Sequence, residues 1–141
     1  MLKVVLDTNI IVSAMHRNEG SPALIVSSVL NGKLKLCLSD EIFSEYAGVL
    51  NRPRFRYLDR PAVKKVLAQL NKKSLRVCPK ETIDIIKDDP EDNKFLECAT
   101  EARADFLITG NKKHFPFSKF GKTAVMSPGE FALVLAKLLM R

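Results

Sequence analysis

The sequence predicts an α/β fold in which helices cover both faces of a mainly parallel central sheet, giving a three-layer α/β/α sandwich. Short apolar runs typical of buried strands alternate along the chain with longer segments of helical periodicity. Such alternation indicates β-α-β units joined by right-handed crossovers. The 141 residues, with no repeat and no linker-like stretch, favour a single domain over residues 1–141.

The first predicted strand is the apolar run at residues 3–6. Ser21 and Pro22 provide an N-cap and a first-turn proline for a helix that ends at Asn31-Gly32. Residues 34–38 form the second predicted strand. These elements make the first β-α-β unit of the sheet.

Ser39 is the expected N-cap of the next helix, whose apolar side chains share one face and which stops at Pro53. Residues 61–73 form another amphipathic helix, and residues 74–78 a third strand. A second β-α-β unit therefore follows the first.

Asp89-Pro90 opens a helix that is predicted to run to about Ala104. Strands at 105–109 and 123–126 follow, and the closing helix has the clearest boundary of the chain. Residues 127–130, Ser-Pro-Gly-Glu, form a capping box with proline at the first helical position.

The composition suits a protein that binds polyanions in the cytoplasm. Lysine and arginine total 23 against 16 acids, giving a net charge of +7, which favours contacts with phosphates. No apolar run approaches the roughly 20 residues that cross a membrane, and the N-terminus lacks the features of a signal peptide. Cys37, Cys78 and Cys98 are odd in number, widely spaced and set among apolar neighbours, so we expect reduced core thiols and no disulfide framework.

Acidic residues recur at positions that a folded sheet would bring together. Asp7 directly follows the first strand, although an Asx-turn or helix cap would also explain it. Glu45 borders the apolar stripe of its helix, where it either contacts a base or cation or extends to water. Asp92 lies over the inward side of its helix, in a run with four carboxylates in five residues (88–92). Such crowding calls for a divalent cation or neighbouring bases.

Thr109 and Asn111 flank Gly110 immediately after another predicted strand. Because ligands of parallel α/β sheets bind at the carboxyl ends of the strands, these groups and the acids should meet at one edge. Oxygen ligands with no histidine or cysteine nearby suit Mg²⁺ or Mn²⁺ and argue against Zn²⁺. The sequence therefore predicts a hard-cation site at this edge.

At these residues the chain resembles the PIN-domain nucleases, over essentially its whole length. The segments that carry the resemblance are 4–9, 38–53, 89–99 and 104–111, in this order. Within the family the chain looks most like the toxin components of prokaryotic toxin–antitoxin pairs. The resemblance implies a PIN-like nuclease domain that hydrolyses phosphodiester bonds of single-stranded RNA with Mg²⁺ or Mn²⁺. It also implies a small antitoxin partner and a homodimer.

The resemblance assigns the metal ligands to Asp7, Glu45 and Asp92. A fourth acid of the family pattern is here Asn111, which offers a neutral oxygen and puts a second metal in doubt. Asn111 is still counted among the catalytic residues. The supporting residues are Asn9, Thr109 and Asp89. Either Asp89 or Glu91 is a candidate to supply the missing charge.

Basic residues near this edge are candidates for RNA contact. Arg52, Arg54, Arg56 and Arg60 are interleaved with Phe55 and Tyr57, and Lys112, Lys113 and His114 precede Phe115, Phe117 and Phe120. Bases with stackable aromatic rings are typical of single-strand binding, although the aromatic residues are better explained as core beneath loops. The residues predicted to bind RNA are Arg52, Arg54, Arg56, Lys112 and Lys113. His16 and Arg17 also follow Asp7 closely enough to approach a substrate.

Three other functions are compatible with parts of this pattern. A haloacid-dehalogenase-like phosphatase needs Asp-x-Asp, and Asn9 stands at its second position. A receiver domain would place its acids differently. A catalytically degraded PIN-like RNA-binding or scaffold protein stays open, because Asn111 replaces an acid.

Overall fold

The computed structural model describes residues 1–140. Its strands are β1 (Lys3–Leu6), β2 (Lys35–Leu38), β3 (Leu75–Arg76), β4 (Phe106–Ile108), β5 (Lys119–Phe120) and β6 (Thr123–Met126). Its α-helices are α1 (Thr8–His16), α2 (Ser21–Leu30), α3 (Asp40–Leu50), α4 (Arg60–Lys73), α5 (Asn93–Ala102) and α6 (Pro128–Leu139). Short 3-10 turns are η1 (Pro53–Phe55), η2 (Pro90–Asp92) and η3 (Lys112–His114).

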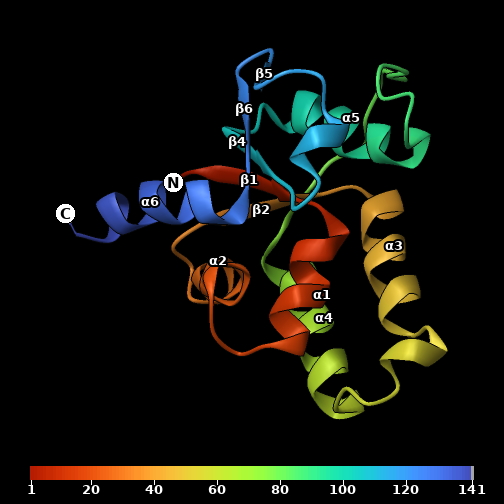
Figure 1. Cartoon of the computed structure of the whole chain (residues 1–141), viewed down its shortest axis with the longest axis vertical. Helices are drawn as coiled ribbons and strands as arrows, with labels where there is room; N and C mark the ends of the chain where they lie inside the picture. Colours follow the sequence, from red (N-terminus) through yellow and green to blue (C-terminus); the bar gives the residue numbers. More distant parts are fainter. Residues whose placement is uncertain (141) are drawn as a thin grey trace.

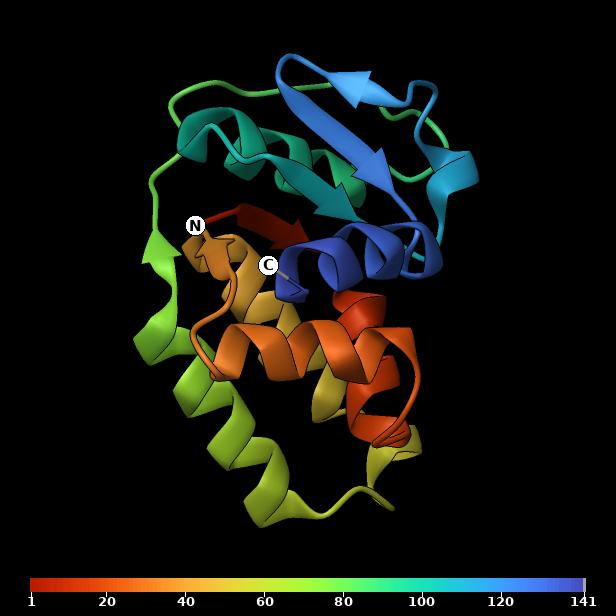
Figure 2. The ribbon, with the colours of Figure 1, turned by 90° about the vertical axis from the view of Figure 1, so that its left-hand side faces the viewer.

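The strands form one six-stranded sheet in the order β3-β2-β1-β4-β6-β5. All neighbouring pairs are parallel except β5 with β6, which is antiparallel. Figures 1 and 2 show α5 on one side of β1, and α1 and α2 on the other. α6 packs against α2 and β6, and α3 packs against α1 and α4. The predicted fold class, a mainly parallel sheet flanked by helices, is confirmed.

The sheet reverses its direction of growth between β1 and β4. The chain adds β2 and β3 on one side of β1, and then β4 and β6 on the other. Loops at the carboxyl ends of two such strands diverge and leave a crevice, where ligands of open α/β sheets usually bind. Asp7 follows β1 and Thr109 follows β4, so both stand at this crevice.

Local capping explains the helix boundaries that the sequence predicted best. The Ser39 hydroxyl accepts a hydrogen bond from the Ile42 amide at 3.2 Å, at the start of α3. At α6, the Ser127 hydroxyl accepts from the Glu130 amide at 3.1 Å, and the Glu130 carboxylate accepts from the Ser127 amide at 2.9 Å. This reciprocal pair is the predicted capping box, and β6 also has its predicted bounds.

Several boundaries differ from the prediction. Helix α1 was not predicted, although a helix cap was one alternative for Asp7, which occupies the N-cap position of this helix. The edge strand β5 was also missed, and β3 covers only two residues. The predicted Asp89 helix begins instead with the turn η2, and α5 ends at Ala102 because Arg103 adopts the left-handed conformation with φ 54°.

The core lies on both faces of β1 and links the sheet to the helices. Tyr46 is fully buried, and its hydroxyl donates to the Leu6 carbonyl at 2.5 Å. This bond ties α3 to the carboxyl end of β1, directly before Asp7. Helix α3 therefore holds the end of the central strand in place.

Two of the three cysteines belong to the core. Cys37 and Cys98 are buried, and burial raises their thiol pKa values to about 11 and about 12. Cys78 is exposed, so the prediction of three core thiols was wrong for this residue, which lies after the short β3 and outside the packed sheet. Within the described residues, no helix is both long enough and apolar enough to cross a membrane.

Candidate active site

Asp7 lies at the centre of the crevice and is only 5% exposed. Its backbone amide continues the sheet by donating to the Ile108 carbonyl at 2.9 Å, and its Oδ2 accepts from the Thr109 hydroxyl at 2.6 Å. Asp7 is the N-cap residue of α1, but its side chain forms no capping hydrogen bond of standard geometry. Burial raises the pKa of Asp7 above its ordinary value, and the Thr109 hydrogen bond opposes this rise. The backbone amides of Asn9 and Thr8 also lower the pKa of Asp7, and the charge of Glu45 raises it.

The turn after β4 is fixed by hydrogen bonds from two directions. The fully buried Thr109 hydroxyl also accepts from the Asn111 amide at 3.0 Å. The Asn9 side-chain oxygen accepts from the Gly110 amide at 3.3 Å. Asn9 and Thr109 therefore lock the turn against α1, and Asn111 lines the same pocket as Asp7.

Asp92 reaches the crevice from the opposite wall. It is 7% exposed, and its Oδ2 atom is buried without a hydrogen-bond partner. Burial is the main cause that raises the pKa of Asp92 to about 7, and the charges of Asp7 and Asp89 raise it further. A buried carboxylate oxygen without a hydrogen-bond partner is costly, so this position favours either a proton or a nearby cation.

Asn93 holds the acidic turn in place. Its side-chain oxygen accepts from the amides of Ile85 and Ile86 at 3.0 and 2.9 Å. Its amide nitrogen donates to the carbonyls of Ile86 and Pro90 at 3.1 and 3.0 Å. Because Asn93 is 5% exposed, these four bonds join a long loop to the start of α5 and position Asp89 and Asp92. Sequence reasoning missed this role, because Asn93 stands out only as a polar residue between the acids and the apolar stripe of α5.

Glu45 enters from α3, with both carboxylate oxygens engaged. Oε2 accepts from the Thr8 hydroxyl, and Oε1 lies 2.7 Å from the Lys94 ammonium. The Lys94 side chain is 4% exposed and also lies 3.2 Å from Glu91. Burial lowers the pKa of Lys94, but the hydrogen bond and charge of Glu45 outweigh burial and raise it. Of the alternatives for Glu45, the structure therefore shows contact with a base.

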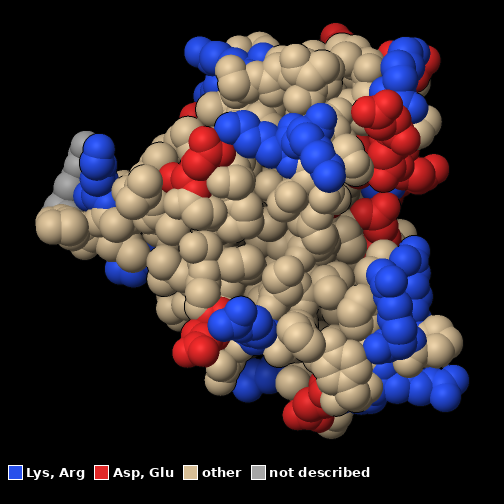
Figure 3. Space-filling model, in the orientation of Figure 1, with Lys and Arg blue, Asp and Glu red and all other residues tan. Residues whose placement is uncertain are grey.

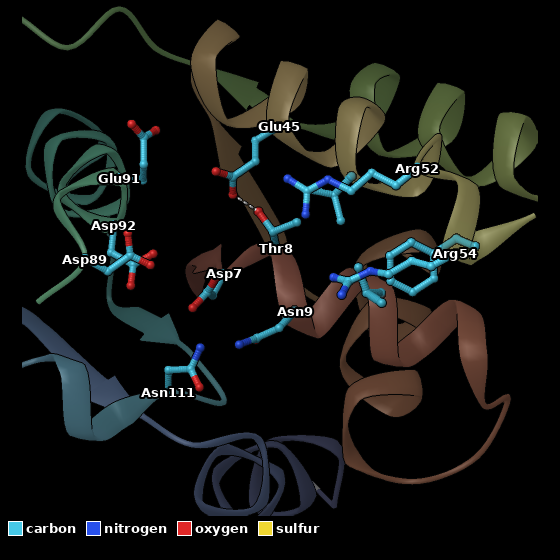
Figure 4. A pocket seen from close by; sticks show the side chains of 13 residues that line it. Asp7, Thr8, Asn9, Glu45, Arg52, Arg54, Asp89, Glu91, Asp92 and Asn111 are labelled. Atoms are coloured by element: carbon cyan, nitrogen blue, oxygen red, sulfur yellow. Dashed lines mark hydrogen bonds between the residues drawn. The ribbon is translucent and has the colours of Figure 1, made fainter.

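One pocket of about 370 Å³ is lined by Asp7, Glu45, Asp92 and Asn111, among others. Figure 4 shows Asp7 at its centre, with Asp89 and Asp92 on one side and Arg52 and Arg54 on the other. Figure 3 shows the same arrangement on the surface, where acidic residues form a group with basic residues beside it. The pocket therefore has acidic side chains at its centre and on one side, and Arg52 and Arg54 form a basic rim on the other side.

Comparisons with known proteins agree with this geometry. Residues 3–113 match the family model described as PIN domain. The chain belongs to the PIN domain family. An uncharacterised protein of Methanocaldococcus jannaschii is 31% identical over 113 residues, which cover 79% of this chain and 72% of the relative. PIN domains are generally nucleases, so the family makes a nuclease the coarse functional class.

A solved structure shares the fold. VapBC-1 from nontypeable Haemophilus influenzae matches with a TM-score of 0.53 and 19% identity, over 81% of this chain and 90% of that chain. At this identity the match concerns the arrangement of the PIN domain, with its parallel sheet and flanking helices. The site residues of this PIN domain are therefore argued from its own geometry.

The donors of the PIN domain pocket fit a divalent cation. Asp7 and Asp92 present buried carboxylates, Asp89 adds a third, and Asp92 Oδ2 has no partner within the protein. Oxygen donors of this kind are what Mg²⁺ and Mn²⁺ bind. Glu45 fits less directly, because Lys94 already neutralises it.

The basic residues predicted to bind RNA separate into groups. Arg52 and Arg54 line the pocket, and Arg54 stacks over the Phe55 ring at 4.8 Å. Arg56 is exposed outside it. The expectation that Arg60 is available for RNA contact is corrected. Its guanidinium donates to the carbonyls of Leu50, Leu58 and Phe55 and holds the loop around η1.

Lys112 and Lys113 do not line the pocket. Lys112 forms an ion pair with Glu130 at 2.9 Å, whereas Lys113 is exposed. His16 contacts the Tyr57 hydroxyl at 2.5 Å and lines a different pocket together with Arg17. Tyr57 itself is 61% exposed, so the expectation that the aromatic residues form core was wrong there, because the η1 loop projects beyond the sheet.

The expectation of no histidine near the acids was also wrong. His114 Nδ1 lies 3.9 Å from Asp92 Oδ2. The turn η3 folds back through a hydrogen bond of 2.8 Å from the His114 amide to the Asn111 carbonyl. This return of the chain is a tertiary effect that residue spacing did not reveal.

Proposed function

We propose that this protein is a metal-dependent endoribonuclease that hydrolyses phosphodiester bonds of single-stranded RNA. The observation that carries the proposal is the meeting of Asp7 and Asp92 in one pocket, with a buried carboxylate oxygen that lacks a partner. Asp7 and Asp92 would hold Mg²⁺ or Mn²⁺, with Asp89, Glu45 and Asn111 at its margin. When bound, such an ion stabilises charge on the phosphate and activates water for attack.

The protein's own side chains account for binding and orientation. Thr109 fixes the Asp7 carboxylate through its hydrogen bond, and Tyr46 fixes the strand end that carries Asp7. Arg52 and Arg54 supply positive charge on the opposite rim, where the RNA backbone can lie across the acids. The pocket is open, as a polymer substrate requires.

The first experiment is cleavage of labelled single-stranded and structured RNAs by purified protein, with Mg²⁺, Mn²⁺ or EDTA. We expect cleavage only with metal, and no cleavage by Asp92→Asn. Equal inactivity of both proteins on every RNA, with RNA binding retained, would instead support the scaffold function that Asn111 suggests.

The two rim arginines should determine the salt dependence of RNA binding. The double variant Arg52→Ala/Arg54→Ala removes two phosphate contacts, so the slope of log affinity against log salt should fall by about 1.4. Fluorescence anisotropy of a labelled RNA in EDTA measures this without cleavage. The control Lys64→Ala/Lys65→Ala removes two exposed charges from α4 and should leave the slope unchanged. Equal slopes for both double variants would place the RNA elsewhere.

We further propose that the protein is a cytoplasmic toxin that is neutralised by a small antitoxin and that forms a homodimer. The resemblance of its motifs to toxin components supports this proposal. Expression of the wild-type protein should arrest growth, and expression of Asp92→Asn should not. The mass of the purified protein in solution tests the homodimer. The mass after co-expression with the product of the adjacent gene tests the antitoxin. A monomer that captures no such product would contradict this part.

A further inference from the structure

We propose that His114, together with Asp89 and Asp92, forms a mixed nitrogen and oxygen site for a first-row transition-metal dication. The inference rests on the proposed nuclease and names a ligand for its metal that is outside the acidic set. Ligand atoms of these three residues lie within 4.8 Å of one another. Asp92 lies in η2, Asp89 directly precedes η2, and His114 lies in η3, a turn distant in the sequence.

Two atoms at the centre of this group lack partners. Asp92 Oδ2 and His114 Nδ1 are both buried and form no hydrogen bond. Their separation of 3.9 Å is too long for a hydrogen bond. Two ligands of one ion at roughly 2.1 Å each can be separated by up to about 4.2 Å. The gap therefore fits an ion between the two atoms better than it fits direct contact.

The position of His114 relates to the missing acid. Asn111 occupies the acidic position of the family motif, and His114 follows in the same turn, tied back to Asn111 through its backbone. A neutral imidazole contributes a strong donor where the amide contributes a weak one. Asp92 is common to both groups, since it also lines the pocket with Asp7. The turn η3 thus supplies a strong neutral nitrogen donor close to Asn111, whose amide oxygen is a weak one.

The imidazole also implies a choice of metal. Carboxylates alone accept Mg²⁺ readily, whereas imidazole favours later first-row ions. His114 should therefore make Mn²⁺ bind more tightly than Mg²⁺. The chain has only two histidines, and the other, His16, contacts Tyr57 in a different pocket. A nitrogen signal from a bound ion can consequently be assigned to one residue.

The test is pulsed EPR of untagged protein loaded with one equivalent of Mn²⁺ alone. We expect a ¹⁴N coupling from a directly bound imidazole in the wild-type protein and in His16→Ala. The coupling should be absent in His114→Ala and His114→Asn, which should bind Mn²⁺ at least about tenfold more weakly. The His114 side chain is 31% exposed, and circular dichroism will check that both variants fold.

Absence of the coupling in wild type, or its survival in both His114 variants, would overturn the inference. These outcomes can be distinguished from a failure of the proposed nuclease function. RNA cleavage without the coupling would leave the proposed function standing and remove His114 from the site. The coupling without RNA cleavage would establish the metal site and count against the nuclease.

Discussion

Asp7→Asn should abolish metal-dependent RNA cleavage, with a loss of about 100-fold or more. Asparagine can still accept the Thr109 hydrogen bond, so the geometry of the turn should be preserved. What disappears is the negative charge at the centre of the pocket. Initial rates of RNA cleavage in Mn²⁺ measure the loss.

The same change should not destabilise the metal-free fold. Burial raises the pKa of Asp7, so ionisation at neutral pH destabilises the folded state, and a neutral amide removes that cost. In EDTA, the melting temperature of Asp7→Asn should equal or exceed that of the wild-type protein. Addition of Mn²⁺ should raise the melting temperature of the variant by less than it raises that of the wild-type protein. Asp59→Asn, at an exposed residue before α4, is the matched control. A variant that cleaves RNA normally would remove Asp7 from the mechanism.

Asn93→Ala should be the most damaging change to stability near the site, lowering the free energy of unfolding by about 3 kcal/mol. It leaves the amides of Ile85 and Ile86, of which the Ile86 amide is buried, and the facing carbonyls without their partner. The loop that leads to Asp89 should then loosen, and both Mn²⁺ affinity and resistance to proteolysis should fall.

Urea unfolding and limited proteolysis measure these effects. Asn31→Ala removes an exposed asparagine after α2 and should change stability little. Asn93→Asp keeps the two acceptor contacts and loses the donor contacts, so we expect an intermediate loss. If Asn93→Ala is no less stable than Asn31→Ala, the loop must be held by other contacts.

Local sequence signals predicted the parts of the fold that local chemistry decides. The capping box at Ser127 and Glu130 gave the start of α6, and the apolar strands gave β1 and β6. Helix α1 was missed because its first residues are also good turn formers, so only packing against α2 and α3 decides their state. Strand β5 depends entirely on pairing with β6.

The same division applies to the site. Asp7 and Thr109 follow strands, so the rule for parallel sheets was enough to bring them to one edge, where they form a hydrogen bond. Lys94 and His114 could not be predicted, because their contacts depend on how α5 and η3 face their neighbours. One signal was available for Lys94, which lies three residues after Glu91 on adjoining turns. Whether the acids bind metal stays a prediction.

The buried ion pair between Lys94 and Glu45 has a consequence for the life of the protein before it meets a metal. An internal ammonium group already balances the carboxylate of α3, so this wall of the crevice does not depend on an external cation for its shape. Folding of the protein and binding of a metal can then occur as separate events. Under the proposed metal-dependent mechanism, a chain that folds without metal would be inactive, and added metal would activate it without new synthesis.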